Sequence, residues 1–344
     1  MSIKILHITD FHYRHNSRLF YSIAKKLNNG FIKNNFNCNE ISERETYKNF
    51  FGVTDLNNII LKNFYNLNPD LIVLGHCSKI DKKTLLEIKK INQKVKIIQW
   101  FVDSLTKFGP DFEHNKKTFL KYIEFIDYSF ITTSVDSINL KKKYKTKISF
   151  IPNPCDISVD NLKIDQKKNP IFDFFFAMSH GQHRGVLKKF YIDKRENFIK
   201  KIVMKNQNIL FDFYGLNNVN PVWGDVFFER LSQSKMALNL SRGSPIKYYS
   251  SDRISSLLGN GITTFIDRKT KLNDFFSDNE VIFYNDINDL SETLNYLKKN
   301  DKKRREIGKN GRLKYHKMFN NKIITKYMIE KVFELNFSSN YAWL

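Results

Sequence analysis

The sequence predicts an α/β protein built from two parallel-sheet domains, and three observations support this fold class. Short apolar runs of strand length alternate with stretches of helical period along most of the 344 residues. Residues 152–170 contain three prolines and interrupt this alternation, which then starts again. Residues 235–267 have the strand, loop, helix and strand pattern of a βαβ unit. We therefore expect two facing Rossmann-like domains with a ligand-binding cleft between them.

The first half contains five predicted strands separated by helices. Apolar runs predict strands at residues 3–9, 71–74, 95–101, 128–132 and 148–151. Apolar residues repeated every three or four positions predict helices at residues 17–27, 54–65, 81–91, 118–125 and 135–143. Because alternating strands and helices favour a parallel sheet, we predict an N-terminal domain over residues 1–160.

The second half repeats the alternation. Strands are predicted at residues 172–177, 209–214, 236–240, 262–267 and 281–284. Helices are predicted at residues 194–204, 224–234, 253–260, 287–299, 301–316 and 322–335. We predict a second Rossmann-like domain over residues 161–330, and we expect residues 331–344, with their aromatic ending, to pack back on the first domain.

Composition excludes several classes of protein. Hydrophobic residues at 41% and aromatic residues at 15% support packed cores, which excludes a disordered chain. The sequence has no run of about 18 apolar residues, so we expect no transmembrane helix. The N-terminus has the pattern of a strand and not of a signal peptide, so we expect a cytoplasmic protein. Cys38, Cys77 and Cys155 are single cysteines without metal-ligand spacing, which predicts free thiols.

The net charge of +22 predicts an affinity for anions such as nucleic acid, an acidic membrane surface or a phosphorylated ligand. Abundant Lys, Asn, Ile and Phe are typical of an AT-rich genome, which explains part of this charge. The lysines are spread over both halves, which disfavours nucleic-acid binding. The basic helix at residues 299–317 could rest on the acidic inner face of a membrane, or it could be a solvated helix.

The loop at residues 241–252 is the strongest candidate for a ligand site. It leaves the carboxyl end of a predicted strand, where open α/β sheets bind ligands. The cations Arg242, Lys247 and Arg253 surround it, next to a helix N-terminus that favours anions. Further candidates in and beside it are Gly243, Tyr248, Tyr249, Ser251 and Asp252. This chemistry suits a phosphorylated ligand, and the alternative is a solvated loop between core strands.

Four segments resemble the C-terminal domain of GT-B glycosyltransferases, in particular the spore-maturation-protein-type or glycosyl transferases group 1 family. They are FFFAMSHGQHRG…KRENFIKKI, FDFYG, LNLSRG…DRISSLLGNG and VIFYNDINDLSETLNYLKKNDKKRREIGKNGRLKYHKMF, in this order. In the first half, KIIQWFVDSL and ISFIPNPCD also resemble family positions. The resemblance covers roughly residues 170–320 well and the first half loosely.

The resemblance implies a glycosyltransferase whose C-terminal domain binds a nucleotide-sugar and whose N-terminal domain binds the acceptor. The implied acceptor is a cell-envelope glycan, such as lipopolysaccharide, or a lipid-linked precursor, and retention is the implied stereochemistry. The sequence has no metal-ligand cluster, no DxD triplet and no Gly-rich nucleotide motif. We therefore expect a metal-independent reaction without a cofactor, in which the nucleotide-sugar is a substrate.

The chain departs from the family pattern at one position. The family carries a Glu about five residues before the glycine that follows the donor-loop helix, to hold the nucleotide ribose. Ser256 occupies that position here, and Asp252 lies one turn earlier. The missing Glu favours an alternative, a non-catalytic GT-B-like protein that binds sugar or nucleotide. The charge favours another alternative, a basic nucleic-acid-binding protein.

Candidate catalytic residues follow other predicted strands. Arg184 could neutralise the leaving diphosphate, because fixed cations stabilise charge that develops in a dry site. Asp103 and His12 are candidate acceptor-side groups, since an inverting transferase needs a general base. Tyr214 and Gly215 end a strand that is expected to face the donor.

Overall fold

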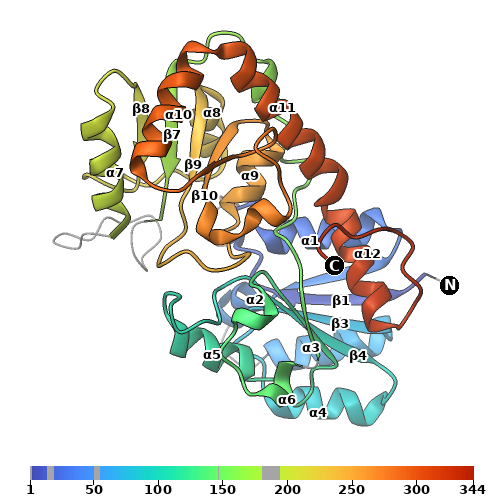
Figure 1. The fold of residues 1–344 in the computed structure, drawn as a ribbon. Helices are drawn as coiled ribbons and strands as arrows, with labels where there is room; N and C mark the ends of the chain where they lie inside the picture. The colour runs from blue at the N-terminus through green and yellow to red at the C-terminus, as the bar shows by residue number, and fades with distance from the viewer. Residues whose placement is uncertain (1, 14–18, 50–54, 146, 180–193) are drawn as a thin grey trace. The chain divides into compact units, whose positions relative to one another are not determined.

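The computed structural model describes residues 2–13, 19–49, 55–145, 147–179 and 194–344 (Figure 1). The chain forms two compact units. The first unit comprises the chain up to Asp156 together with Phe319–Leu344, and the second unit comprises Ile157–Met318.

The first unit contains a six-stranded parallel sheet. Its strands are β1 (Lys4–Thr9), β2 (Asn37–Ser42), β3 (Leu71–Gly75), β4 (Lys96–Phe101), β5 (Tyr128–Ile131) and β6 (Ile148–Phe150). They are arranged in the order β2-β1-β3-β4-β5-β6, with every neighbouring pair parallel. The carboxyl ends of all six strands therefore meet at one edge, and the strand order reverses between β1 and β3. Such a reversal is where open α/β sheets place their ligands.

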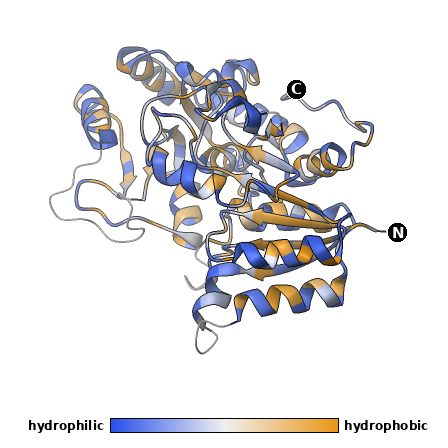
Figure 2. Ribbon diagram, turned by 90° about the horizontal axis from the view of Figure 1, so that it is seen from below, coloured by the Kyte–Doolittle hydropathy of each residue, from blue (hydrophilic) through white to orange (hydrophobic). Residues whose placement is uncertain are grey.

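Helices cover this sheet and bury its apolar residues. They are α1 (Ile23–Lys33), α2 (Glu43–Asn49), α3 (Leu56–Leu67), α4 (Lys82–Ile91), α5 (Phe112–Leu120), α6 (Lys142–Lys145) and α12 (Asn321–Val332). One core cluster joins residues of β1, β3 and β4 to the apolar sides of α3 and α4. In Figure 2 these strands are mostly orange, whereas the helices show both colours, as amphipathic helices on a buried sheet should.

A buried tryptophan crosses the central strand of this sheet. Gly75 on β3 pairs with Trp100 on β4, and a Cβ added at residue 75 would lie only 2.1 Å from the indole ring. The missing side chain lets the indole pass over β3, where its Nε1 donates a hydrogen bond of 3.1 Å to Nε2 of His7 on β1. Glycine at residue 75 is therefore a packing requirement and not a turn signal.

The second unit contains a five-stranded parallel sheet. Its strands are β7 (Phe172–Ala177), β8 (Phe211–Tyr214), β9 (Ser234–Asn239), β10 (Thr263–Asp267) and β11 (Ile282–Tyr284), in the order β11-β10-β9-β7-β8. Its helices are α7 (Lys194–Lys205), α8 (Gly224–Ser232), α9 (Arg253–Gly259), α10 (Ile287–Lys299) and α11 (Asp301–Met318). Aromatic residues of β7 and β10 join Leu290 and Leu294 of α10 in its core. The strand order reverses between β7 and β9, as it does at β1 and β3 in the first unit.

In the first half, two elements were missed and three predicted helices were wrong. We predicted neither β2 nor α2, because β2 reads NCNEIS and exposes half of its residues, as an edge strand can. The helix predicted at residues 118–125 is instead α5, which begins at Phe112 and ends at Leu120. The helix predicted at residues 135–143 is a 3-10 turn, Val135–Ser137, followed by the single turn of α6. The first helix begins at Ile23 and not at residue 17.

The last helix belongs to the first unit. We predicted that residues 161–330 form the second domain, but the chain returns to the first unit at Phe319, and α12 packs against α1. The approach is close, since a Cβ at Gly30 would lie 2.4 Å from the carbonyl oxygen of Asn321. The tail packs on α12, with the rings of Tyr341 and Trp343 4.9 and 5.5 Å from Tyr327. Among the described residues, no helix is long and apolar enough to cross a membrane.

Candidate functional site

The β9–α9 loop, residues 241–252, is closed at its base by side-chain hydrogen bonds. Nδ2 of Asn239, at the end of β9, donates to Oγ of Ser250 over 3.0 Å. The backbone N–H of Ser251 donates to Oγ of Ser241 over 2.9 Å. Short polar side chains that bond to nearby backbone fix a loop in the way that turns do. The loop therefore has a defined shape at the carboxyl edge of the second sheet.

Tyr248 anchors the tip of the β9–α9 loop. It has a left-handed backbone with φ of 61°, and its N–H donates to the carbonyl of Thr270 over 2.7 Å. Its hydroxyl donates to Oδ2 of Asp274 over 2.8 Å, and its ring centroid lies 4.6 Å from that of Phe275. Lys247 lies over the same ring, with Nζ 5.0 Å from the centroid. These contacts tie the loop to the segment after β10.

Arg253 bridges the ends of two strands. Its Nε donates to the carbonyl of Ala177 at the end of β7, and one terminal nitrogen donates to the carbonyl of Leu240 after β9, both over 3.0 Å. The guanidinium also lies 5.1 Å from the ring centroid of Phe176. Arg253 thus builds the scaffold of the loop, and its predicted contact with a phosphate stays a prediction.

The other predicted donor-side residues lie around the same edge. Gly215 has φ of 78°, and a Cβ there would lie 1.9 Å from the carbonyl oxygen of Met178, so only glycine fits. Burial and the Asp212 carboxylate raise the pKa of Tyr214 to about 12.

Gly243 also has a left-handed backbone, with φ of 88°, and Tyr249 is buried. Gly215 and Arg253 both contact the end of β7, which brings these two predicted residues together.

Ser256, which occupies the position of the family's Glu, has no exposed side chain. Ser256 is buried in α9, and its carbonyl accepts a hydrogen bond of 2.7 Å from Nδ2 of Asn260. Asp252, at the start of the same helix, is exposed. Arg184 and its neighbours in residues 180–193 lie outside the described residues.

In the first unit, Asp10 organises the loop after β1. Its carboxylate is buried and accepts the N–H of His12 over 3.0 Å. Arg44, in α2, lies 3.1 Å from the other carboxylate oxygen. His12 has φ of 62°, and its Nδ1 lies 3.4 Å from Oδ1 of Asp10. The predicted residue His12 is therefore paired with Asp10, whereas Asp103 has a different partner.

Asp103 lies beside His76, for which the sequence suggested no role. His76 follows β3 and Asp103 follows β4, and Nδ1 of His76 lies 3.6 Å from Oδ2 of Asp103. Nε2 of His76 accepts the N–H of Val102 over 3.0 Å. A histidine directly after the buried run LIVLG was the available signal, because that position must lie at the carboxyl edge of the sheet.

A buried carboxylate shapes the loop that carries His76. Glu43, the first residue of α2, is fully buried and accepts the N–H groups of Ser78 and Lys79 over 2.8 and 2.6 Å. Burial raises the pKa of this carboxyl, against the opposing effect of these backbone donors. Sequence reasoning missed Glu43 and Arg44 because it missed β2, the strand that places them.

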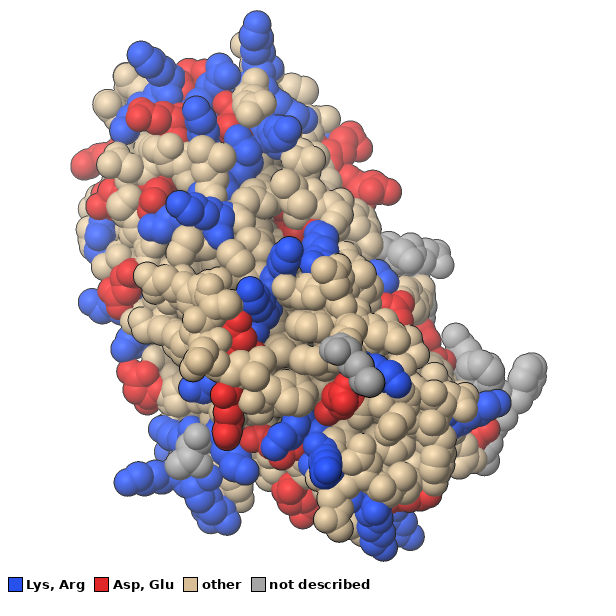
Figure 3. Space-filling model, turned by 90° about the vertical axis from the view of Figure 1, so that its right-hand side faces the viewer, with Lys and Arg blue, Asp and Glu red and all other residues tan. Residues whose placement is uncertain are grey.

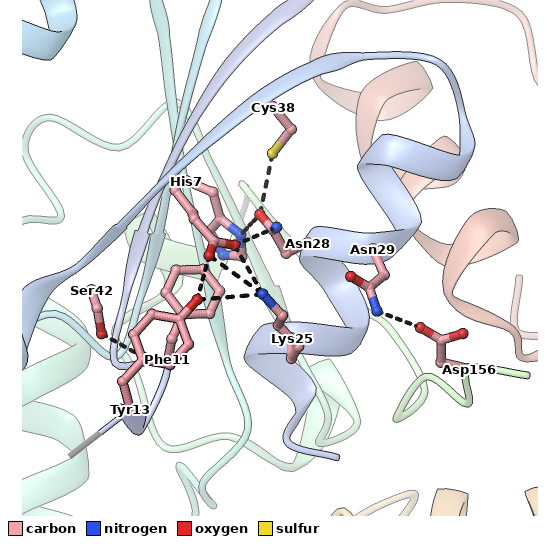
Figure 4. Close-up of polar contacts among 10 residues, drawn as sticks. His7, Phe11, Tyr13, Lys25, Asn28, Asn29, Cys38, Ser42 and Asp156 are labelled. Atoms are coloured by element: carbon pink, nitrogen blue, oxygen red, sulfur yellow. Dashed lines mark hydrogen bonds and ion pairs between the residues drawn. The ribbon is translucent and has the colours of Figure 1, made fainter. Parts of the chain in front are cut away.

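Behind this edge, a polar network connects β1, β2 and α1 (Figure 4). Nδ1 of His7 and Oδ1 of Asn28 are 3.0 Å apart, and Nδ2 of Asn28 donates to Glu40 over 2.7 Å. Lys25 and Tyr13 contact the same Glu40 carboxylate. Burial lowers the pKa of His7 from 6.5 to about 4.

Within the described residues, no group of three or more His, Cys, Asp or Glu could hold a metal ion.

Comparisons with known proteins agree with this architecture. A family model described as glycosyl transferase-like matches residues 194–330. No curated protein matches the chain.

Three solved structures resemble the chain over almost its whole length. An alpha-glucosyltransferase in complex with UDP and a 13-mer DNA has 13% identity and a TM-score of 0.63 over 96% of this chain and 100% of its own. Anabaena HepE in complex with UDP has 11% identity and a TM-score of 0.55 over 97% and 100%. Sucrose-phosphate synthase from Thermosynechococcus elongatus has 11% identity and a TM-score of 0.53 over 96% and 98%.

These findings confirm the predicted fold class and the resemblance. The two parallel-sheet α/β units are those of the GT-B fold. The chain therefore has the GT-B fold, and its residues 194–330 match the glycosyl transferase-like family.

Proposed function

We propose that this protein transfers a sugar from a nucleotide-sugar to a cell-envelope glycan or a lipid-linked acceptor. The observation that carries the proposal is the β9–α9 loop, which is closed by Asn239 and Ser241 and anchored by Tyr248 and Arg253. It presents the half-buried cations Arg242 and Lys247 at the carboxyl edge of the sheet, within the segment that matches the glycosyl transferase-like family. Similar structures bind UDP, which supports a nucleotide-sugar donor.

The reaction divides between the two units. The second unit holds the nucleotide-sugar, and Arg184 neutralises the leaving diphosphate. The first unit binds the acceptor next to Asp103 and His12, and the transfer needs no metal ion. The protein acts in the cytoplasm, with the basic helix α11 in peripheral contact with the acidic inner face of the membrane.

A thermal-shift screen against UDP-, GDP-, ADP-, CMP- and dTDP-sugars tests the donor site. A ligand at about 100 times its Kd stabilises the folded protein by about 2.7 kcal/mol, which raises the unfolding midpoint. We expect one nucleotide class to give this shift and Lys247→Ala to reduce it. Lys299→Ala is the matched control, because Lys299 is an exposed lysine at the end of α10. If no nucleotide gives a shift, the proposed donor site is wrong.

The buried Ser256 supports a second candidate, a non-catalytic protein that binds a sugar or nucleotide. Without a carboxylate at this position, the ribose loses a contact that family members make. The discriminating measurement is release of UDP from UDP-sugars, followed in the same samples that show a thermal shift. Binding without turnover, with all acceptors tried, would favour this candidate over the transferase.

The charge supports a third candidate, a protein that binds nucleic acid. Structures of an alpha-glucosyltransferase among the structural neighbours were solved with DNA. However, Lys and Arg outnumber Asp and Glu by 28 to 17 in the first unit and by 29 to 18 in the second, so each unit has a net charge of +11. On the face that Figure 3 shows, Lys and Arg are dispersed among acidic and uncharged residues. Fluorescence anisotropy with duplex DNA tests this candidate, which requires tight binding that falls steeply with salt.

A further inference from the structure

We propose that the amino edge of the second sheet, at β7 and β8, is a surface that binds an anionic lipid bilayer. The surface consists of the lysines of this edge and of four exposed apolar residues, which we call the amino-edge patch: Ile171, Val203, Met204 and Leu210. The inference deepens the peripheral membrane contact of the proposed function and rests on it. It places that contact at the first turn of α11 and at the two strands next to it.

α11 covers the amino ends of the other three strands. One terminal nitrogen of Arg304 donates to the carbonyl of Lys235 in β9 over 3.0 Å, and the carbonyl of Arg304 accepts the hydroxyl of Thr263 in β10 over 2.6 Å. A Cβ at Gly311 would lie 2.5 Å from the carbonyl oxygen of Glu280, two residues before β11. The helix therefore starts near β9 and runs away from β7 and β8 (Figure 1).

The amino ends of β7 and β8 expose apolar side chains instead. Ile171, directly before β7, is 61% exposed, and Leu210, directly before β8, is 50% exposed. The carbonyl of Leu210 accepts the N–H of Asp173 over 2.8 Å, so the two exposed residues belong to paired strands. In the part of the chain that the structure describes, this edge is thus apolar where α11 does not reach it.

The end of α7 extends the patch. Met204, in the last turn of this helix, is 75% exposed, and Val203 beside it is exposed as well. The N–H groups of Asn206 and Ile209 donate to the carbonyls of Val203 and Asn206 over 3.1 and 3.0 Å. These two tight turns lead directly into Leu210, so the exposed apolar residues of α7 and of the strand ends form one surface.

Lysines border the amino-edge patch. Residues 167–171, 200–210 and 296–303 contain nine lysines and one acidic residue, Asp301, which is paired with Arg304. The third segment is adjacent to the other two, because Nζ of Lys298 lies 2.8 Å from Oδ2 of Asp173 at the start of β7. Exposed apolar residues with a basic rim are complementary to an anionic bilayer, which attracts cations and accepts apolar side chains.

The later turns of α11 offer less to a lipid surface. Arg312 donates to both carboxylate oxygens of the buried Asp165, over 2.7 and 2.9 Å, and Nζ of Lys314 lies 2.9 Å from Glu280. These cations hold the helix to its own unit. Lys201 and Lys205, which flank the exposed residues of α7, are themselves exposed.

The chemistry of the patch favours a bilayer over nucleic acid. Aliphatic side chains gain free energy when they leave water for acyl chains, whereas a phosphodiester backbone gives them no comparable partner. Single-stranded nucleic acid is bound by aromatic rings on which bases stack, and none of the four patch residues is aromatic. The donor loop lies at the opposite, carboxyl end of the strands, so a bilayer at the amino edge leaves it open.

Co-sedimentation with lipid vesicles tests the inference. We expect the protein to bind vesicles of phosphatidylglycerol and phosphatidylcholine in equal parts, but not vesicles of phosphatidylcholine alone. Met204→Gln and Leu210→Gln should each weaken binding about 5- to 10-fold, since each replaces an apolar side chain that enters the bilayer. Lys205→Ala should weaken it about fivefold at about 0.1 M salt and have little effect at about 1 M, where charges are screened.

Matched controls locate the surface. Leu313, on the outer face of α11, is 50% exposed like Leu210, and Leu313→Gln should leave vesicle binding unchanged. Leu86, on α4 of the first unit, is also exposed beside lysines, and Leu86→Gln should have no effect. If either control weakens binding while Met204→Gln and Leu210→Gln do not, the surface lies elsewhere and the inference is wrong. Binding to duplex DNA without binding to anionic vesicles would overturn it too.

The thermal shift with nucleotide-sugar distinguishes failure of this inference from failure of the proposed function. Met204→Gln and Leu210→Gln change exposed side chains far from the donor loop, so they should keep the unfolding midpoint and the nucleotide shift of the wild type. A nucleotide shift without vesicle binding would overturn the membrane surface alone. Vesicle binding that depends on Met204 and Leu210, without any nucleotide shift, would contradict the transferase and keep the surface.

Discussion

The carboxyl edges of the two sheets use polar residues in different ways, although both sheets reverse their strand order at the same place in the topology. In the second unit, side-chain hydrogen bonds fix the shape of the β9–α9 loop, and they come from Asn239, Ser241 and Arg253. In the first unit, His76 follows β3 and Asp103 follows β4. The backbone of His76 is strained, and the carboxylate of Asp103 is exposed. Polar side chains therefore fix the backbone of the β9–α9 loop in the second unit, whereas in the first unit they leave the carboxylate of Asp103 exposed.

The largest expected effect is a loss of kcat, and it should differ between carboxylates at the two sheet edges, Asp103 and Asp252. Asp103→Asn removes a proton acceptor, and we expect kcat to fall about 10²- to 10⁴-fold with an unchanged unfolding midpoint. Asp252→Asn, at the exposed start of α9, should instead raise the KM for the nucleotide-sugar. Steady-state kinetics and thermal unfolding of both variants provide the measurement. Equal effects of the two variants on kcat would remove the distinction between the edges.

A second prediction concerns the pH dependence of the first unit. Burial lowers the pKa of His7 from 6.5 to about 4, so folding favours its neutral ring. The resulting stability is complete above pH 6.5 and is lost as the pH falls towards 4, and a shift of this size corresponds to about 3 kcal/mol. Urea unfolding at pH 7.5 and pH 4.5 should show a smaller loss for His7→Gln than for the wild type. An equal loss in the two proteins would mean that groups other than His7 dominate this pH range.

A third prediction concerns the packing of the Trp100 indole over Gly75 of β3. Gly75→Ala places a Cβ against the indole, and we expect a loss of about 1–3 kcal/mol in the free energy of unfolding. Trp100→Leu in the same chain should reduce the effect of Gly75→Ala, because the two residues share one contact. Urea denaturation of both single variants and the double variant measures this coupling, and simple additivity would contradict the packing argument.

The smallest expected effect comes from the strand bridge in the second unit. Arg253→Ala leaves the carbonyls of Ala177 and Leu240 without this donor, and we expect about 1–2 kcal/mol of destabilisation. Lys247→Ala removes a cation from the same loop and should reduce nucleotide binding with little loss of stability. Thermal unfolding with and without nucleotide separates the two variants. If Arg253→Ala unfolds like the wild type, Arg253 is not the scaffold residue that its contacts indicate.

The sequence by itself determined the fold class and the ends of most strands. The fully buried parallel strand β3 is a continuous apolar run, and β7 becomes one after Asp173, so their composition and length identified them. The ends of these runs also placed Asp103, two residues after β4, and Tyr214, the last residue of β8, at the carboxyl edges of the sheets. The segment that matches the glycosyl transferase-like family was recognisable because its loop and helix are contiguous in the chain.

Only the tertiary structure decided which residues meet across strands. β2 was not predictable because a polar edge strand has no apolar signal, and with it Glu43 and Arg44 were missed. The His76–Asp103 pair and the Trp100–His7 bond join residues 27 and 93 positions apart. The first contact joins the ends of the adjacent strands β3 and β4, and the second spans β3 between β4 and β1. The place of α12 in the first unit depends on the close packing of Gly30 against Asn321, a contact between the two ends of the chain. The local sequence pattern determines whether a segment forms a helix or a strand. The partners of its side chains depend on the order of the strands in the sheet, which the local pattern does not contain.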